Sequence, residues 1–273
     1  MLLELDGQSV YVNTGGEAHS AGAPVICFIH GAAMDHTVWT LFARYWAKRG
    51  FNAMAVDLPG HGLSTGDPLP RIEENAQLLQ RLVDTHIPDS SVYWVGHSMG
   101  SLIALECARI VNRSKALVMM GTAFPMAVGS PLLDSARANQ HMAIDIVSLF
   151  GHSYGSQLGG NPVAGIHAQT LAERLMEQVD DDGMYTDLNA CHQYDQGEAT
   201  AARINCPSYL ILAELDRMTP PRAARSLIDN LPAVTVHSLS DCGHMMMTEQ
   251  PEQTHRALLA SIEAAAGPEL AQA

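Results

Sequence analysis

Short apolar runs that alternate with amphipathic stretches constrain the fold of this chain more than any other feature. Each run is four or five residues long and almost free of polar side chains, which is the pattern of parallel strands buried on both faces. The runs are 25–29, 53–56, 92–95, 116–120 and 209–212. Because stretches with helical spacing follow them, they predict a doubly wound sheet that binds ligands at the carboxyl ends of its strands.

The two ends of the chain add further strands to this sheet. Alternating runs at 2–6 and 9–13 flank Asp6-Gly7, a two-residue hairpin signal, and predict an antiparallel edge. A strand-like run at 234–239 brings the number of predicted strands to eight. The predicted fold class is therefore α/β, with a doubly wound and mostly parallel eight-stranded sheet.

The alternation stops after the sixth predicted strand. Residues 124–203 contain helix-like stretches but no strand run of comparable quality, and Ser130-Pro131 predicts a helix start with the serine as its cap. The strand pattern then resumes. We predict a core domain made of residues 1–123 and 204–273, with a helical lid of residues 124–203 inserted after strand 6.

The charge balance excludes several classes of partner. With 15 Lys and Arg against 29 Asp and Glu, the net charge of −14 repels phosphate backbones, so nucleic acid is not an expected partner. The first residues lack the basic segment of a secretory signal, and no apolar run approaches the ~20 residues that span a bilayer. These features predict a cytoplasmic enzyme without a membrane span, as a monomer or homodimer.

No cofactor or metal site is predicted. The five cysteines are scattered without a C-x-x-C pair, which favours reduced thiols over a zinc or redox site. The acidic run Asp180-Asp181-Asp182 lacks the spaced oxygen ligands of a calcium loop and is interpreted as a solvated helix end.

Gly96-His97-Ser98-Met99-Gly100 stands between a predicted strand and a predicted helix, the context of a G-x-S-x-G nucleophile elbow. A serine held in a strained turn brings the backbone two residues to either side too close for a Cβ atom, which explains the glycines. The following helix start offers unpaired amides and a positive dipole end to a developing anion. Because a serine hydroxyl alone is a poor nucleophile, a base and a group that orients it must also be present. In the fold typical of this elbow they follow later in the chain, in the order acid and then histidine.

Asp216 and His244 meet this expectation. Asp216 follows the apolar run that ends at residue 212, and His244 follows the run that ends at residue 239. Since Ser98 also follows a strand, all three lie at carboxyl ends of strands and therefore at one edge of the sheet. We predict Ser98 as nucleophile, His244 as its base and Asp216 as the group that orients the base.

Two further motifs carry a family resemblance. His30-Gly31-Ala32-Ala33 follows the third predicted strand, and Asp-Leu-Pro-Gly-His-Gly-Leu-Ser occupies 57–64 after the fourth. With the elbow, they make nearly the whole chain resemble the α/β-hydrolase fold superfamily, specifically its lidded serine hydrolases. The resemblance implies an oxyanion hole formed by the N–H groups of Ala32 and Met99. A serine nucleophile argues against the epoxide-hydrolase and dehalogenase branches of this fold.

Other residues near these motifs receive different interpretations. Glu214 could supply the acid, but the family pattern and the turn position favour Asp216, and Asp241 lies too close to the histidine along the chain. His30, His61 and His97 sit inside motifs and are expected to hydrogen-bond the loops rather than to act on substrate.

Three functions remain open at this point. The first is a carboxylesterase that cleaves esters of small to medium apolar acyl groups through an acyl-enzyme. The second is a carbon-carbon bond hydrolase of meta-cleavage products, for which Arg137, Arg174 and Arg203 are candidates to bind a dienoate carboxylate. The third is a low-turnover ligand receptor on the same fold, since fold similarity alone does not choose between them.

The chain contains 14 methionines, and their positions suggest a flexible apolar pocket. Core packing is the alternative for most of them individually. Those in the lid or beside the predicted triad are Met126, Met142, Met176, Met184, Met218, Met245, Met246 and Met247.

Overall fold

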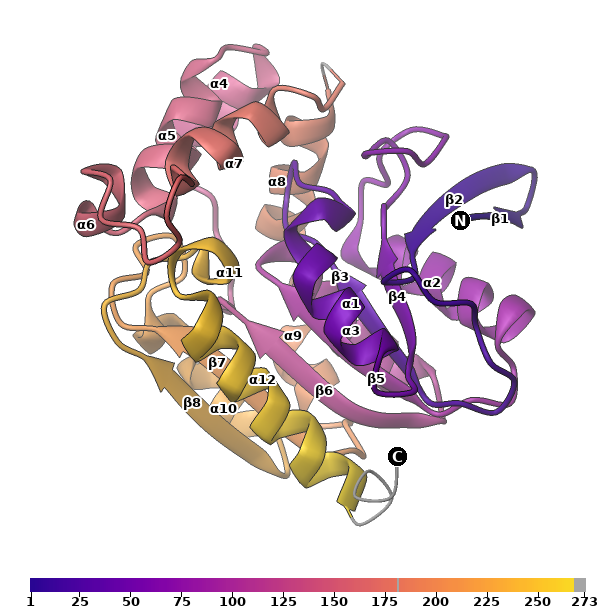
Figure 1. Cartoon of the computed structure of the whole chain (residues 1–273). Helices are drawn as coiled ribbons and strands as arrows, with labels where there is room; N and C mark the ends of the chain where they lie inside the picture. Colours follow the sequence, from indigo (N-terminus) through magenta and orange to yellow (C-terminus); the bar gives the residue numbers. More distant parts are fainter. Residues whose placement is uncertain (181, 268–273) are drawn as a thin grey trace.

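The computed structural model describes residues 1–180 and 182–267, so Asp181 of the acidic run lies outside the described residues. Within these ranges an eight-stranded sheet forms, with the strand order β1-β2-β4-β3-β5-β6-β7-β8 (Figure 1). β2 pairs antiparallel with β1 and β4, and the remaining pairs are parallel, which confirms the predicted sheet. The strands are β1 (Leu2–Leu5), β2 (Gln8–Asn13), β3 (Val25–Ile29), β4 (Asn52–Val56), β5 (Val92–His97), β6 (Ser114–Met120), β7 (Ser208–Ala213) and β8 (Val234–Leu239).

Helices cover both faces of this sheet. α1 and α12 pack on one face, while α2 and α3 pack on the other together with α9 and α10. The helices are η1 (His36–Trp39), α1 (Thr40–Ala47), α2 (Ile72–His86), α3 (Met99–Ile110), α4 (Ser130–Arg137), α5 (Met142–Gly151), α6 (Tyr154–Gln157), α7 (Ala168–Met176), α8 (Gly183–Gln193), α9 (Gly197–Ala201), η2 (Pro221–Ala224), α10 (Arg225–Asn230), α11 (Met246–Glu249) and α12 (Pro251–Ala266). No helix in the described ranges is both long and apolar enough to cross a bilayer.

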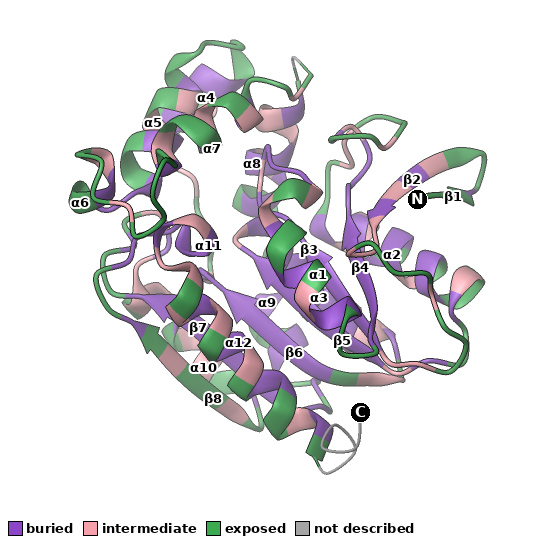
Figure 2. Ribbon diagram, in the orientation of Figure 1, coloured by how far each residue is buried: buried purple, intermediate pink, exposed green. Residues whose placement is uncertain are grey.

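The central strands are buried on both faces, which explains their continuous apolar sequence. Every residue of β3, β4, β5 and β7 is buried (Figure 2). Phe28 and Trp46 pack on the α1 and α12 side, whereas Leu82 and Trp94 pack on the α2 and α3 side. Each fully buried side chain of this size contributes about 2 kcal/mol of transfer free energy. The two cores fix the sheet, and with it the loops at its carboxyl edge.

The segment between β6 and β7, which we call the helical insertion, carries α4 to α9. Its first helices share a separate apolar cluster that includes Leu132, Val147 and Leu188 and reaches Met34 of the β3–η1 loop. Its last part, by contrast, packs in the core on the α2 and α3 side of the sheet, through residues such as Tyr194. The insertion is thus attached to the core at both ends, and its status as a lid domain of residues 124–203 stays a prediction.

The start of α4 differs from the prediction. Gly129 takes the extended backbone conformation at the cap position, and no side chain caps the helix there. Ser130 is already the first helical residue, with Pro131 in the first turn. The predicted cap was therefore wrong by one residue, because glycine adopts the required conformation as readily as serine does.

Glu106 of α3 links the helical insertion to the core. This carboxylate is 1% exposed and accepts hydrogen bonds from the Tyr194 hydroxyl at 2.6 Å and the Thr200 hydroxyl at 2.7 Å. Its other oxygen lies 2.7 Å from the guanidinium of Arg109. Three donors therefore converge on one buried anion.

Replacing Glu106 with alanine is expected to lower the free energy of unfolding by about 3 kcal/mol, because buried donors lose their partner. Urea unfolding of Glu106→Ala and Glu106→Gln measures the effect. The glutamine variant keeps the shape and one acceptor oxygen, so we expect a smaller loss. Equal stability of the alanine variant and the wild type would show that this network does not hold the insertion.

Candidate active site

Ser98 occupies a strained turn between β5 and α3, with φ 55° and ψ −121°. The flanking glycines are required by close backbone contacts. A Cβ on Gly96 would lie 1.9 Å from the carbonyl oxygen of Gly100, and a Cβ on Gly100 would lie 2.3 Å from that of Ile29. The predicted steric reason is confirmed for Gly96, whereas Gly100 is required by the approach of the β3 end rather than by the turn itself. Holding a non-glycine residue in such a conformation costs about 1–3 kcal/mol, which the surrounding packing offsets.

Asp216 and His244 come together in the structure at the carboxyl ends of β7 and β8. Oδ2 of Asp216 lies 2.8 Å from Nδ1 of His244, and both residues are 3% exposed. Burial alone would raise the pKa of the Asp216 carboxyl, but the charge and hydrogen bond of His244 outweigh it and lower the pKa to about 2. The carboxylate is therefore ionised at neutral pH. It accepts the Nδ1 proton, so Nε2 is left as the basic nitrogen.

Thr219 supports this pair and was not identified from the sequence. Its hydroxyl donates to Oδ2 of Asp216 at 2.8 Å and lies 3.1 Å from Nδ1 of His244. The backbone N–H groups of Met218 and Thr219 donate to Oδ1 of Asp216 at 2.9 and 2.7 Å. An aspartate that accepts from N–H groups two and three residues onward forms an Asx-type turn, and the sequence Asp-Arg-Met-Thr was the available signal.

His97 holds the backbone of His244. Its Nε2 lies 2.9 Å from the carbonyl oxygen of His244, to which it donates. Burial, assisted by the neighbouring His244 ring, lowers the pKa of His97 to about 3, so the ring stays neutral. His30 likewise bridges two loops, since Nδ1 donates to the Gly31 carbonyl at 2.9 Å and Nε2 accepts from the Leu58 N–H at 3.1 Å. The predicted loop-binding role of these histidines is confirmed.

Ser98 and His244 line one small pocket of about 30 Å³, which we call the Ser98 pocket. The Ser98 hydroxyl makes no hydrogen bond to any residue in the described part of the chain, including His244. Four methionines line the same pocket: Met34, Met184, Met218 and Met245. The predicted methionine-lined pocket is thus present in part. Met126 instead packs in the core on the α2 and α3 side of the sheet, and Met142 is exposed.

Ala32 and Met99 present backbone N–H groups beside Ser98. Met99 is the first residue of α3, so its N–H has no partner within the helix. Among the described residues, no acceptor receives a hydrogen bond from the N–H of Ala32. A Cβ on Gly31 would lie 3.2 Å from the Cβ of Ser98, which shows how closely this loop approaches the elbow. The oxyanion hole that these two N–H groups would form stays a prediction.

Asp187 of α8 connects the helical insertion to the loop after β3, and no pattern in the sequence had indicated this role. Its Oδ2 accepts the N–H of Ala33 at 2.8 Å and lies 2.9 Å from Nε2 of His61. Nδ1 of His61 lies 3.0 Å from the carbonyl oxygen of Pro59. Both ring nitrogens of His61 face acceptors, so both donate and the ring is an imidazolium. Burial lowers the pKa of His61, but the Asp187 carboxylate more than compensates and raises it to about 9.

The charge on His61 should make stability depend on pH. In the folded protein the pKa of His61 is about 9, above the ordinary value of 6.5. The stabilisation of the folded state by this charge is therefore complete below pH 6.5 and is lost as the pH rises through 9. This difference corresponds to roughly 3 kcal/mol. We expect Asp187→Asn to lower the unfolding free energy strongly at pH 6 and little at pH 10, as measured by urea unfolding. A pH-independent difference would contradict the charged pair.

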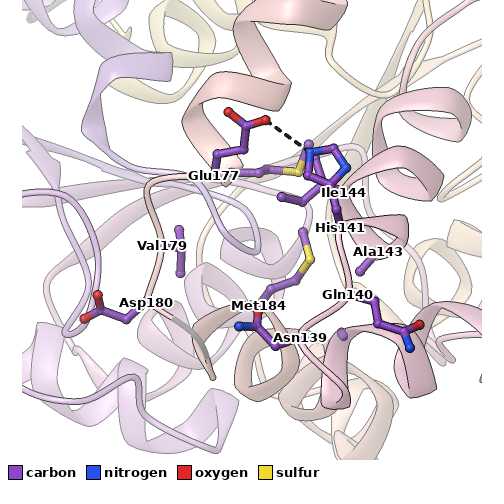
Figure 3. A pocket seen from close by; sticks show the side chains of 11 residues that line it. Asn139, Gln140, His141, Ala143, Ile144, Glu177, Val179, Asp180 and Met184 are labelled. Carbon is purple, nitrogen blue, oxygen red and sulfur yellow. Dashed lines mark hydrogen bonds and ion pairs between the residues drawn. The ribbon is translucent and has the colours of Figure 1, made fainter.

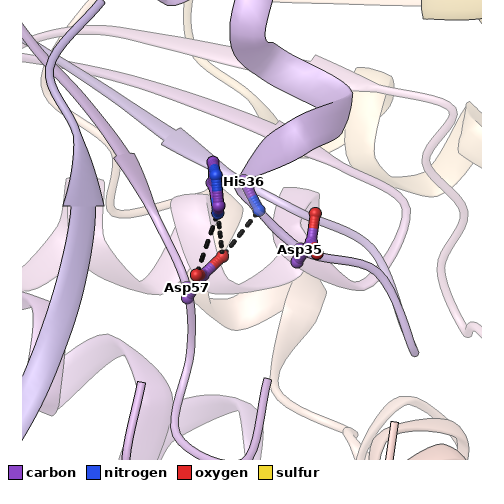
Figure 4. Close-up of side chains that lie close together, drawn as sticks. All are labelled: Asp35, His36 and Asp57. Carbon is purple, nitrogen blue, oxygen red and sulfur yellow. Dashed lines mark hydrogen bonds and ion pairs between the residues drawn. The ribbon is translucent and has the colours of Figure 1, made fainter. Parts of the chain in front are cut away.

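A second ion pair, His36 with Asp57, stabilises the loops after β3 and β4 (Figure 4). Nδ1 of His36 lies 2.8 Å from Oδ1 of Asp57, which also accepts the backbone N–H of His36. Burial opposes the pair, yet the hydrogen bond with Asp57 raises the pKa of His36. Asp35 points to its own turn, where Oδ1 accepts the Thr37 N–H at 2.7 Å. These oxygens are occupied by internal hydrogen bonds, so we interpret the cluster as structural.

A cavity of about 220 Å³ with a mixed polar and apolar lining lies in the helical insertion, among α4, α5, α7 and α8 (Figure 3). Glu177 and Asp180 line it, and Glu177 pairs with His141 at 3.1 Å. We call it the α4–α8 cavity. It shares Met184 with the Ser98 pocket.

The candidate arginines for a substrate carboxylate do not line the Ser98 pocket. Arg137 donates to the Tyr185 hydroxyl at 2.8 Å, and Arg174 pairs with Glu177 at 2.6 Å. Arg203 is exposed beyond α9.

Comparison with known proteins places this arrangement in a family. The chain is 28% identical over 263 residues to a pimeloyl-[acyl-carrier protein] methyl ester esterase of Chromobacterium violaceum, covering 93% of this chain and 98% of that protein. It is 24% identical to 2-hydroxy-6-oxononadienedioate/2-hydroxy-6-oxononatrienedioate hydrolase 2 of Pseudomonas putida, over 94% of this chain and 92% of the relative.

Solved structures show the same fold. The enol-lactonase of Burkholderia xenovorans superposes with a TM-score of 0.82 at 21% identity, covering 96% of this chain and 99% of that one. Residues 28–257 match the sequence profile of the Alpha/beta hydrolase family, which spans most of the chain from β3 to α12. This protein therefore belongs to the alpha/beta hydrolase family.

Proposed function

We propose that this protein is a serine hydrolase that cleaves a carboxylic ester of a small to medium apolar acyl group through an acyl-enzyme. One observation carries the proposal: the unbonded hydroxyl of Ser98 shares a pocket with His244, whose other ring nitrogen is held 2.8 Å from Asp216. A nucleophile, a base and a group that orients the base are the parts that acyl transfer needs.

In the proposed mechanism, Nε2 of His244 accepts the Ser98 proton while Oγ attacks the ester carbonyl carbon. Asp216 holds the Nδ1 proton and stabilises the imidazolium that forms. The N–H groups of Ala32 and Met99 donate to the oxyanion, and each contributes about 3 kcal/mol to the transition state. The imidazolium then returns its proton to the departing alcohol. Water, deprotonated by His244, attacks the acyl carbon and releases the acid and free Ser98.

Ester cleavage is favoured over carbon-carbon bond cleavage. None of the three candidate arginines lines the Ser98 pocket, and Arg174, which lines a larger cavity beside it, is paired with Glu177 at 2.6 Å. The relatives named as methyl ester esterases agree with an ester substrate, whereas the Pseudomonas putida relative keeps the alternative open. In this proposal residues 124–203 act as a lid, because Val147, Met184 and Leu188 cover the Ser98 pocket.

A fluorophosphonate probe tests the proposal directly, since it reacts with a serine that a neighbouring base activates. We expect one label per chain, on the peptide that contains Ser98, together with turnover of p-nitrophenyl acetate. A ligand receptor on the same fold would give neither result. Preferential turnover of dienoates over esters would instead support the carbon-carbon bond hydrolase.

A further inference from the structure

A larger cavity adjoins the Ser98 pocket and is lined by residues of α1, α7 and α11. Figure 1 shows where these helices lie. Its volume is about 430 Å³, against about 30 Å³ for the Ser98 pocket. Ligand sites typically occupy roughly 300–1,000 Å³, so this cavity has the size of a substrate site and the Ser98 pocket does not. We call it the α1–α7 cavity.

Exposed apolar side chains gather on this cavity. Leu41 of α1 is 73% exposed and Leu171 of α7 is 50% exposed, and both line it with Val163 and Ile166, which are also exposed. Apolar surface concentrated at one concave site indicates an apolar ligand, because each of these side chains would leave water when the site is filled.

The charged groups at the α1–α7 cavity are already engaged. Asp35 caps η1 through its hydrogen bond with the Thr37 N–H, and Arg174 pairs with Glu177 at 2.6 Å. The lining therefore favours an uncharged ligand. The α4–α8 cavity is less apolar, since Glu177 and Asp180 line it together with Asn139 and Gln140.

Met34 and Met245 separate the Ser98 pocket from the α1–α7 cavity, because both residues line both spaces. Met245 directly follows His244 in the chain, and Met34 lies two residues after Ala32. Methionine has three rotatable bonds and no branch, so rotation of two side chains can join the spaces without moving the backbone. The Ser98 pocket alone holds about two water molecules and no acyl chain.

We infer that the α1–α7 cavity binds a linear aliphatic chain of the ester substrate, which passes between Met34 and Met245 to reach Ser98. This inference rests on the proposed serine hydrolase function and adds the substrate class. The chain can belong to the acyl side or to the alcohol side of the ester, and the experiment distinguishes them.

Two substrate series test the inference in the purified full-length protein. p-Nitrophenyl acetate, butyrate and octanoate lengthen the acyl side, and ethyl, butyl and octyl acetate lengthen the alcohol side. We expect kcat/KM to rise in one series by up to about fourfold per methylene, the value of a buried CH₂ group. Activity that falls or stays level with length in both series would overturn the inference.

Variants at the cavity locate the effect. Leu41→Glu and Leu171→Glu place a charge in the lining of the cavity. Each is expected to lower about tenfold the ratio of kcat/KM for the eight-carbon substrate to kcat/KM for the shortest substrate of the same series. Leu158→Glu is the matched control, because Leu158 is 71% exposed and does not line the cavity. Equal kcat/KM ratios in all three variants would overturn the inference. It would also be overturned if light scattering showed that the wild type is a dimer and that Leu41→Glu dissociates it.

The two proposals fail in different ways. If only the chain site is wrong, fluorophosphonate still labels Ser98 and short esters are still hydrolysed, without dependence on chain length. If the serine hydrolase proposal is wrong, labelling and short-ester turnover are both absent in the wild type.

Discussion

Ser98→Ala is expected to lower kcat/KM for p-nitrophenyl esters by about a million-fold, the scale found when the serine of such a triad is removed. Ser98 lines the Ser98 pocket from a strained turn, and among the described residues no other hydroxyl shares that pocket with His244. The residual activity of the variant should come from direct attack by water, which the N–H groups of Ala32 and Met99 accelerate by stabilising the oxyanion. Fluorophosphonate labelling should disappear in the same variant.

The fold of this variant should be intact, because alanine fits the space of serine. Alanine keeps the unfavourable φ of 55°, whereas glycine adopts it freely. Ser98→Gly is therefore expected to be inactive as well but more stable than Ser98→Ala, by about 1–3 kcal/mol in urea unfolding. Substantial activity in either folded variant would sink the assignment of Ser98 as nucleophile.

Asp216→Asn is expected to lower kcat/KM about ten-thousand-fold by trapping His244 in the wrong tautomer. Oδ1 of Asp216 accepts the backbone N–H groups of Met218 and Thr219, so the oxygen of an asparagine amide will take that position. The NH₂ group then faces Nδ1 of His244 and donates to it. The remaining ring proton moves to Nε2, which can no longer accept the proton of Ser98.

Glu214 supplies the control for this experiment. It lies two residues before Asp216 and was the alternative acid in the sequence, but it is exposed while Asp216 is 3% exposed and bonded to His244. Glu214→Gln should therefore retain at least half of the wild-type kcat/KM. A large loss in the Glu214 variant, with activity kept in Asp216→Asn, would reverse the assignment of the acid.

The sequence determined the sheet and the position of the site along it. Short uninterrupted apolar runs that alternate with amphipathic helical stretches are typical of central parallel strands, so the layers could be predicted from them. The carboxyl ends of parallel strands share one edge, which is why Asp216 and His244 could be predicted to meet although 28 residues separate them. Gly96 could be predicted because its close contact lies within the turn around Ser98, whereas the close contact of Gly100 is with Ile29 of β3 and depends on the tertiary structure.

Only the tertiary structure decided which distant side chains support that site. His61 lies in a recognisable motif, but its partner Asp187 is 126 residues away and is one of 29 acidic residues. Met34 and Met245 likewise became the wall between two cavities through the packing of the helical insertion on the core. Hydrophobic periodicity determines which face of an element is buried, whereas the contacts between elements depend on how those faces pack together, which no local pattern encodes.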